Sequence, residues 1–303
     1  MQAGIIINPA AGRSGARRAE AHRRRAEAAL ARYGVEGQVR LTERRGSAGS
    51  LARSMLDAGA GTVVAWGGDG TINEVASEAR AAGAALGVVP GGSGNGFAHG
   101  LGLARPPEEA LRIALSGDER VIDTGTIDER LFVNVAGIGF DAHLAGVFND
   151  LTTRGPVAYF RAGLRELLSY RAVRYRVRTA DATIEAAAYL LAIANGPTYG
   201  AGMMIAPGAR ADDGLLDLVI VPERSLPWLL WHLPYLFAGR ADRVPGVRHL
   251  PESSIEIEAD RPLVFHVDGE VYAARGGGLR VSVNRSSLRV RVPAPSRPVP
   301  RRA

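Results

Sequence analysis

The sequence predicts two domains: an N-terminal α/β domain with a parallel sheet over residues 1–122, and a β-rich antiparallel domain over residues 123–292. Strand and helix patterns alternate over roughly the first 90 residues, and short strand patterns separated by turns dominate after about residue 120. Alternating βα units form parallel sheets, whereas closely spaced strands form antiparallel ones. The length of 303 residues, with 46% hydrophobic residues, allows each domain its own core.

The first domain is predicted from apolar strands with helices between them. Glycine ends the first two helices, because it readily adopts the left-handed conformation of a helix C-terminus. Glycine-containing loops follow three of the strands, and in a parallel sheet such loops converge at the carboxyl edge, where ligands bind. The strands cover residues 4–8, 38–42, 62–66 and 85–89, the helices cover residues 14–33, 47–58 and 72–82, and the loops cover residues 8–15, 67–71 and 91–96.

The second domain is predicted from short strands. Helical stretches at about residues 141–170 and 225–238 interrupt them. Residues 293–303 contain four prolines, so we expect an extended or mobile tail. The predicted strands cover residues 131–136, 174–179, 183–194, 215–221, 254–258, 263–267, 279–283 and 288–292.

The composition excludes several classes of protein. Without cysteine the chain has no disulfide framework and no thiolate zinc site, which is compatible with a reducing cytosol. Its start lacks the pattern of a signal peptide, and no apolar run reaches the length of a transmembrane helix. We therefore expect a cytoplasmic protein.

The basic charge leaves more than one partner open. The net charge is +6, with a sequence pI of about 10.1. The arginine clusters are either a solvated helix face and a disordered end, or surfaces that attract an anionic membrane. We expect no nucleic-acid partner, because no basic stripe is interleaved with aromatic residues. The clusters are Arg17, Arg18, Arg23, Arg24 and Arg25 in the first helix, and Arg297, Arg301 and Arg302 in the tail.

The apolar segment LPWLLWHLPYLF, residues 226–237, contains Trp228 and Trp231. Its two prolines argue against one regular helix. Two interpretations are open. The segment is a helical hairpin packed on the sheet, or an apolar lip that meets a membrane or an acyl chain, since Trp and Tyr favour bilayer interfaces.

The turn Gly67-Gly68-Asp69-Gly70-Thr71 indicates phosphate chemistry. It follows a buried strand and leads into a helix, whose free N–H groups and dipole favour an anion. Glycines let the backbone approach that anion closely. Asp69 would repel bare phosphate, so we expect a divalent cation beside it or a role in proton transfer. The turn therefore predicts a nucleotide site that carries out phosphoryl transfer.

Three further segments complete the pattern. Residues 8–15 (NPAAGRSG) follow the first strand, residues 90–98 (PGGSGNGFA) follow the fourth, and Asp268-Gly269-Glu270 comes late in the chain. Each alone could be an ordinary turn, and Asp-Gly pairs are frequent in hairpins. Three strand-terminal loops in one parallel sheet are much harder to explain by chance.

With these motifs the chain resembles the diacylglycerol kinase catalytic-domain superfamily of lipid kinases, which includes soluble bacterial diacylglycerol kinases and sphingosine kinases. The resemblance also includes residues 134–142 (NVAGIGFDA), 195–202 with 207–209, and 213–217. It implies transfer of the γ-phosphate of ATP to a hydroxyl of a membrane lipid, an NAD kinase-like fold with a sandwich-like second domain, and a chain end that returns to the first domain. Peripheral contact with the inner face of an anionic membrane and a homodimer would fit that activity.

The resemblance also implies roles for single residues. Asp69 would face the phosphates through Mg²⁺ and water, and Glu74 would lie near the nucleoside. A structural Mg²⁺ would take the side chain of Asp213 and the backbone carbonyls of Arg210 and Leu215. Asp268 or Glu270 would act near the lipid hydroxyl, as the general base or its orienter. The residues expected to hold ATP are Asn8, Gly67, Gly68, Gly70, Thr71, Glu74, Gly92, Ser93 and Asn95.

Gly96 departs from the family. Many bacterial diacylglycerol kinases have an aspartate there and an arginine at the position of His99. This leaves the acceptor open between diacylglycerol, a sphingoid base and another lipid. Two rival functions stay open as well: an NAD kinase-like enzyme, which shares the Gly-Gly-Asp-Gly turn, and a catalytically silent protein that binds lipid or nucleotide.

Overall fold

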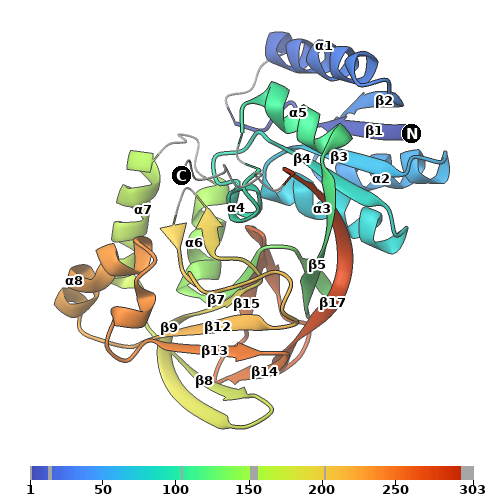
Figure 1. Cartoon of the computed structure of the whole chain (residues 1–303). Helices are drawn as coiled ribbons and strands as arrows, with labels where there is room; N and C mark the ends of the chain where they lie inside the picture. The colour runs from blue at the N-terminus through green and yellow to red at the C-terminus, as the bar shows by residue number, and fades with distance from the viewer. Residues whose placement is uncertain (1, 13–15, 104, 151–155, 201–202, 295–303) are drawn as a thin grey trace, which may run out of the picture.

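The computed structural model describes residues 2–12, 16–103, 105–150, 156–200 and 203–294. Figure 1 shows an N-terminal lobe with helices on both faces of a sheet, and a C-terminal lobe built mainly of strands. The predicted fold class is confirmed. No helix in this described part of the chain is long and apolar enough to cross a membrane.

The N-terminal lobe contains a parallel sheet with the strand order β4-β3-β1-β2. β3 is buried along its whole length, as expected of a strand covered on both faces. The strands are β1 (Gln2–Ile7), β2 (Glu36–Leu41), β3 (Thr62–Gly67) and β4 (Ala85–Pro90). The helices are α1 (Ala16–Arg32), α2 (Ser47–Asp57), α3 (Asp69–Ala81), α4 (Gly96–Gly100) and α5 (Pro107–Ser116).

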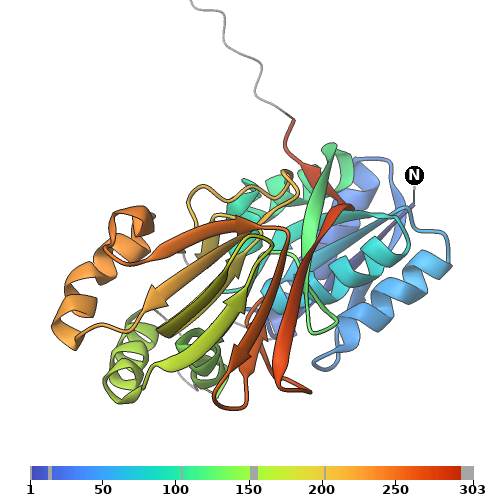
Figure 2. The ribbon, with the colours of Figure 1, turned by 90° about the horizontal axis from the view of Figure 1, so that it is seen from below.

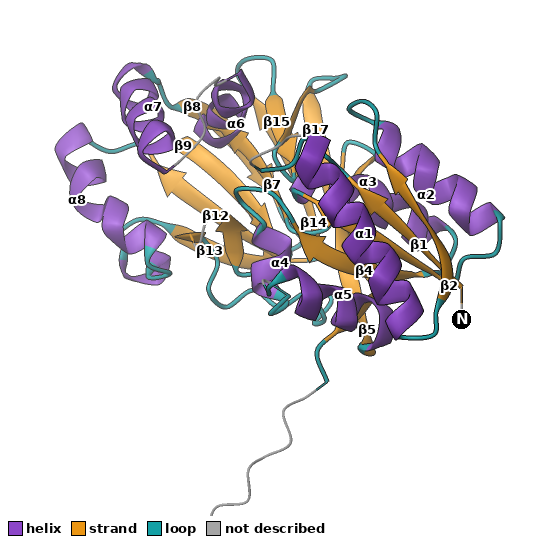
Figure 3. Cartoon of the chain, turned by 90° about the horizontal axis from the view of Figure 1, so that it is seen from above, coloured by secondary structure: helices purple, strands orange, loops and turns teal. Residues whose placement is uncertain are grey.

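Helices cover both faces of this sheet, as Figure 3 shows. Residues of α1 and α5 pack on one face around Trp66, and residues of α2 and α3 pack on the other. Right-handed crossovers between parallel strands place the helices on these faces. α3 begins at Asp69, three residues before the predicted start, so Asp69 lies in its first turn.

The C-terminal lobe is a set of mainly antiparallel strands flanked by α6 (Phe140–Asp150) and α7 (Pro156–Ser169). The single strand predicted over residues 131–136 is wrong: β6 (Arg130–Phe132) and β7 (Val135–Gly139) are separate. Between them, backbone N–H groups donate to Asp268 and not to a neighbouring strand. The other strands are β8 (Val173–Arg178), β9 (Thr183–Ala194), β10 (Thr198–Gly200), β11 (Met203–Met204), β12 (Leu216–Pro222), β13 (Arg248–Glu252), β14 (Ser254–Ala259), β15 (Val264–Val267) and β16 (Glu270–Ala273).

Two paired strands run through both lobes, as Figure 2 shows. β17 (Gly278–Val292) replaces the two strands predicted at 279–283 and 288–292. It pairs with β5 (Asp118–Ile127) through a register shift that keeps it continuous. Near its end it pairs in parallel with β4, so the chain does return to the N-terminal lobe. The residues 295–303 of the predicted tail lie outside the described residues.

Residues 226–237 form one helix, α8 (Leu226–Phe237), so the objection drawn from the two prolines is wrong. Pro227 lies in the first turn, where no N–H is needed, and Pro234 lies only three residues before the end. α8 packs beside α7 in a cluster that includes Leu167 and Leu229. Figure 1 places it at the opposite end of the molecule from α1.

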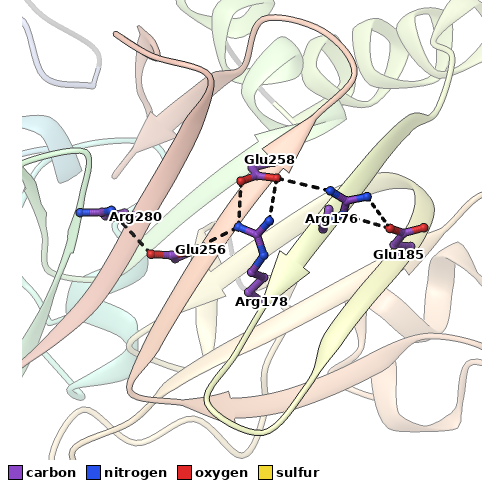
Figure 4. A network of polar contacts seen from close by, with 6 residues as sticks. All are labelled: Arg176, Arg178, Glu185, Glu256, Glu258 and Arg280. Atoms are coloured by element: carbon purple, nitrogen blue, oxygen red, sulfur yellow. Dashed lines mark hydrogen bonds and ion pairs between the residues drawn. The ribbon is translucent and has the colours of Figure 1, made fainter.

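Part of the exposed face of the C-terminal sheet carries a ladder of ion pairs, drawn in Figure 4. In β8, Val173, Tyr175 and Val177 point inward and the arginines between them point outward. Exposed pairs of this kind add at most about 1 kcal/mol each, and they keep this face polar. The ladder consists of Arg176, Arg178, Glu185, Glu256, Glu258 and Arg280.

Candidate active site

The glycine-containing loops meet at the carboxyl edge of the N-terminal sheet. The Asn8 side chain donates a hydrogen bond of 2.9 Å to Thr71 Oγ1, which ties the first loop to the start of α3. A Cβ added to Gly92 would lie 2.7 Å from the Cα of Gly68. The second and third loops therefore approach each other backbone to backbone, and glycine is needed where they touch.

Asn95 closes the third loop on itself. Its Oδ1 accepts a hydrogen bond of 2.9 Å from the N–H of Gly92, and its Nδ2 donates one of 2.7 Å to the Gly92 carbonyl. Its φ of 52° lies in the left-handed region, where asparagine is more frequent than most residues. Asn95 therefore shapes the loop, and the exposed Ser93 is its accessible side chain.

Asp69 lies in the second loop, next to the third. Its Oδ1 is buried and has no hydrogen-bond partner among the described residues. Burial, and then the charge of Asp268, raise the pKa of Asp69 to about 6, while backbone N–H groups of Phe97 and Asn95 act to lower it. Because an unpartnered buried oxygen is costly, this carboxylate fits a site that a cation or ligand completes.

Glu74 has a partner in the fold. Its Oε2 accepts hydrogen bonds from the N–H groups of Ala48 (2.8 Å) and Gly49 (3.2 Å). These groups lie in the first turn of α2, where a carboxylate stabilises the helix. Glu74 therefore joins α3 to α2, and its expected contact with the nucleoside stays a prediction.

Asp268 is buried and saturated with hydrogen bonds. Its carboxylate accepts from the backbone N–H groups of residues 133–135 at 2.9–3.0 Å and from Asn73 Nδ2 at 2.7 Å. Asp268 and Gly269 have φ values of 47° and 89°, as in the two-residue Asp-Gly hairpin turn. Burial raises the pKa of Asp268, and its donors act against that rise. This carboxylate anchors the turn between β15 and β16.

Glu270 is the accessible carboxylate of the same turn. A Cβ added to Gly70 would lie 3.0 Å from Glu270 Oε1, so the side chain reaches the start of α3 from the other lobe. Arg45 forms an ion pair with Glu270 Oε2. Sequence reasoning missed Arg45, because it lies in the loop before α2 and no motif surrounds it. The two carboxylates expected near the acceptor thus differ: Asp268 is enclosed and Glu270 is open.

A buried Asp141–His266 pair supports this turn. His266 Nε2 lies 2.6 Å from Asp141 Oδ2, and the N–H of Gly269 donates a bond of 3.3 Å to His266 Nδ1. Burial alone would lower the pKa of His266, but the charge and hydrogen bond of Asp141, together with the charge of Asp268, raise that pKa. Sequence reasoning missed His266, and the one available signal was a histidine inside an otherwise apolar strand next to Asp268.

Gly96 lies where the lobes touch. A Cβ added there would lie 2.6 Å from Asn134 Nδ2 and 2.6 Å from the Tyr199 carbonyl oxygen. Thr198 Oγ1 donates a hydrogen bond of 2.7 Å to the Gly96 carbonyl, and Asn134 Nδ2 donates one of 2.9 Å to the Thr198 carbonyl. An aspartate has no room here, so the departure from the family accompanies a close contact between the lobes.

Protein groups hold the loop 210–215, where a structural Mg²⁺ was predicted. The buried Asp123 accepts a hydrogen bond of 2.7 Å from the N–H of Gly214. Asp213 is exposed, and its Oδ1 accepts one of 3.1 Å from the N–H of Leu215. Within the described ranges no three His, Asp or Glu side chains gather as a metal site would need. The structural Mg²⁺ at this loop stays a prediction.

The arginines of α1 are mostly paired inside their own lobe, which favours a solvated helix face. Such exposed pairs contribute little stability. Their carboxylates neutralise arginine charge that could otherwise attract a membrane. The arginines of the predicted tail lie outside the described residues. The pairs are Arg23 with Glu27, Arg24 with Glu20, and Arg25 with Glu108.

Comparison with known proteins decides the family. Residues 2–127 match the model of the diacylglycerol kinase catalytic domain, and residues 134–292 match that of the YegS C-terminal NAD kinase beta sandwich-like domain. A Pseudomonas aeruginosa protein named "probable lipid kinase YegS-like" is 36% identical over 286 residues, 90% of each chain. The chain belongs to the YegS-like lipid kinase family. A Chromohalobacter salexigens member with the same name is 37% identical over 245 residues, 77% of this chain and 76% of that protein.

Solved structures share the fold of this chain. One of a diacylglycerol kinase from Bacillus anthracis superposes with a TM-score of 0.73 at 17% identity over 97% of both chains. Another from the same organism gives a TM-score of 0.81 at 19% identity, also over 97% of both. At such low identity the likeness concerns the fold alone. The predicted family is thus confirmed, and the acceptor needs a separate argument.

Proposed function

We propose that this kinase transfers the γ-phosphate of ATP to a hydroxyl group of a membrane lipid. One observation supports this most: the buried Asp69 oxygen, unpartnered among the described residues, and the accessible Glu270 carboxylate lie at the same end of α3, each from a different lobe. One lobe offers glycine loops for phosphates and the other offers a base. That is the arrangement a phosphoryl transfer between two substrates requires.

The N-terminal lobe would bind the nucleotide. The glycine loops and the first N–H groups of α3 would bind the phosphates, and the hydrogen bond between Asn8 and Thr71 ties the first loop to α3. Mg²⁺ fits beside Asp69, because Asp69 Oδ1 is a buried carboxylate oxygen to which no described residue donates a hydrogen bond. When bound with ATP, Mg²⁺ would neutralise phosphate charge and favour the ionised form of Asp69.

Glu270 would act as the general base. As the acceptor oxygen forms its bond to the γ-phosphorus, the bond between that phosphorus and the ADP oxygen breaks, and the hydroxyl proton passes to the Glu270 carboxylate. Arg45 holds one oxygen of Glu270. Asp268 orients the turn that carries Glu270 and does not take the proton, because its lone pairs already accept four hydrogen bonds.

For the acceptor we propose a lipid with a free hydroxyl, diacylglycerol or a related lipid, reached by peripheral contact with the inner face of an anionic membrane. The rival of an NAD kinase-like activity shares the Gly-Gly-Asp-Gly turn, so that turn does not separate the two functions, whereas the relatives are named as lipid kinases. A silent binding protein would have no need of the accessible base beside the phosphate loops.

Labelled phosphate tests this proposal. Mg-ATP with a labelled γ-phosphate is mixed with micelles of diacylglycerol, monoacylglycerol, sphingosine, ceramide or phosphatidylglycerol, and separately with NAD. We expect label in one lipid class. Label only in NADP would contradict the proposal, and so would the absence of label from every lipid although ATP binds.

A further inference from the structure

We propose that α8 docks this protein on the surface of an anionic lipid bilayer, with its exposed apolar face among the lipids and nearby arginines at the lipid phosphates. The inference rests on the proposed function in one respect, because the acceptor of that reaction lies in a bilayer. The contact itself needs no nucleotide, so it is measured apart from catalysis.

The outer face of α8 is apolar. Trp231 is 75% exposed, and Leu230 and Tyr235 are exposed as well. Their spacing, with that of the exposed Pro227 and Pro234, puts them on one side of the helix. Leu229 points the other way and packs in the cluster with Leu167 of α7. α8 thus has one buried side and one apolar side in solvent.

The chemistry of this face matches a bilayer interface. α8 contains no Asp, Glu, Lys or Arg, although solvent-facing helices normally carry charge on their outer side. Trp and Tyr, which sit between headgroups and acyl chains, are among its exposed residues. Leu168, at the end of the neighbouring α7, is another exposed large apolar residue, and Figures 1 and 2 show the two helices side by side.

Positive charge surrounds the apolar face. A cleft of about 460 Å³ is lined by Arg224 and Arg248 together with Glu223. The Arg224 guanidinium lies 6.0 Å from the ring centroid of Trp228, which connects this cleft to α8. Among the described residues no carboxylate forms an ion pair with either arginine. Two more exposed arginines, Arg240 and Arg243, follow the helix.

An anionic bilayer explains these features together better than a second copy of the chain does. Arginine binds phosphate oxygens, and aromatic residues insert beside them. A two-fold contact through the same face would bring the arginines around α8 of the two copies together, so their positive charges would repel each other.

Tryptophan fluorescence reports the contact directly. Trp66 is 2% exposed in the core and Trp228 is partly buried, so the difference between the wild type and Trp231→Phe isolates the exposed indole of Trp231. Vesicles of phosphatidylglycerol and phosphatidylcholine are added without nucleotide. We expect the Trp231 emission to shift to shorter wavelength and to be quenched by brominated acyl chains, and pure phosphatidylcholine to give a much smaller effect.

Matched variants test the two halves of the surface by vesicle sedimentation. Trp231→Ser should weaken binding by at least about tenfold, because the variant lacks the large apolar side chain whose transfer from water into the bilayer favours binding. Val121→Ser, at another exposed apolar residue on β5, is its control. Arg224→Gln and Arg248→Gln should each weaken binding by about fivefold at low salt. Arg280→Gln, which removes the same charge from the ion-pair ladder, should not.

Three results would overturn the docking proposal: equal vesicle binding by Trp231→Ser and Val121→Ser, equal binding to neutral and anionic vesicles, or a dimer in sedimentation that Trp231→Ser converts to monomer. The last result would assign the face to a second copy. Phosphate transfer to a short-chain, water-dispersed acceptor measures the proposed function without a bilayer. If vesicle binding fails but this activity is present, only the docking proposal is contradicted. If vesicle binding is found but this activity is absent, only the proposed lipid kinase function is contradicted.

Discussion

At the residue scale, three carboxylates lie close to the start of α3, and their different burial and hydrogen bonding suit them to different roles. Asp69 has a buried oxygen without a partner in the part of the chain that the structure describes, Asp268 accepts four hydrogen bonds, and Glu270 is partly exposed beside Arg45. An unpartnered oxygen is suited to a ligand, a saturated one to structure, and an accessible one to proton transfer.

Asp69→Asn should stabilise the free protein while removing its activity. The pKa of Asp69 rises from an ordinary value of 3.8 to about 6 on folding. The folded state therefore holds this proton more tightly, and ionisation costs stability above pH 6 but not below pH 4, up to about 3 kcal/mol. Urea unfolding without nucleotide should show the variant more stable at pH 7.5, with a smaller difference at pH 4.

Asp213→Asn is the control for that stability measurement, because Asp213 is exposed and lies outside the loops around α3. Its free energy of unfolding should follow the wild type at both pH values. A loss of stability in Asp69→Asn at pH 7.5 would show that the Asp69 carboxylate is satisfied within the free protein, against the role given to it here.

Glu270→Gln and Asp268→Asn should fail in different ways. The first should lower kcat by about 10²–10⁴ with little change in the KM for ATP, as loss of a general base does. Asp268→Asn replaces one accepting oxygen by an NH2 group, which cannot accept from the N–H donors around it. It should therefore lower the free energy of unfolding by about 3 kcal/mol. Steady-state kinetics and urea unfolding separate the two, with Glu256→Gln in the exposed ladder as control. Equal kinetic and stability losses in both variants would contradict the assignment.

The residues of the site were partly predictable. The glycine turns and Asp69 follow from a strand, a turn and a helix in sequence order. The difference between Asp268 and Glu270 does not, because it depends on donors from residues 133–135, far away in the chain. The roles of Arg45 and His266 were not predicted for the same reason, because each residue contacts its partner only in the tertiary fold.

At the element scale, the third loop and α4 touch the C-terminal lobe at a position that tolerates only glycine. Gly96→Ala would place a Cβ 2.6 Å from the Tyr199 carbonyl oxygen, so it should lower the free energy of unfolding by about 1–3 kcal/mol. Gly208→Ala, where a Cβ meets nothing within 4 Å, should change it by less than about 1 kcal/mol. Equal effects of the two substitutions on thermal or urea unfolding would refute this reading of the contact.

Elements with a regular apolar pattern were predicted well, and elements set by tertiary contacts were not. The parallel strands β1, β3 and β4 lie within a residue or two of their predicted bounds. The break between β6 and β7 depends on Asp268, which no local pattern shows. α8 forms despite its prolines, because Pro227 occupies the first turn and Pro234 lies near the end.

At the scale of the whole molecule, β17 makes the two lobes one folding unit. Leu288, buried in the core cluster of the N-terminal lobe, lies on the same strand as Val281, which is buried in the C-terminal lobe. Leu288→Ala should cost about 2–5 kcal/mol. Hydrogen exchange should show β3 and β9 losing protection together. Loss of protection in the N-terminal lobe alone would contradict a shared unit.

The fold class was predictable because strand alternation and turn spacing are local properties of the chain. The continuity of the sheet across both lobes was not, since β17 reads as two short strands with polar residues between them. The candidate site lies where the lobes meet, so β5 and β17, which both run through the two lobes, also limit how the lobes move against each other.

The most direct test of the account is transfer of labelled γ-phosphate from Mg-ATP to the lipid panel by the wild type and by Asp69→Asn in parallel. The account predicts one labelled lipid with the wild type and at most about 1% of that rate with the variant, which remains folded. A variant that transfers phosphate to lipid at the wild-type rate would contradict it.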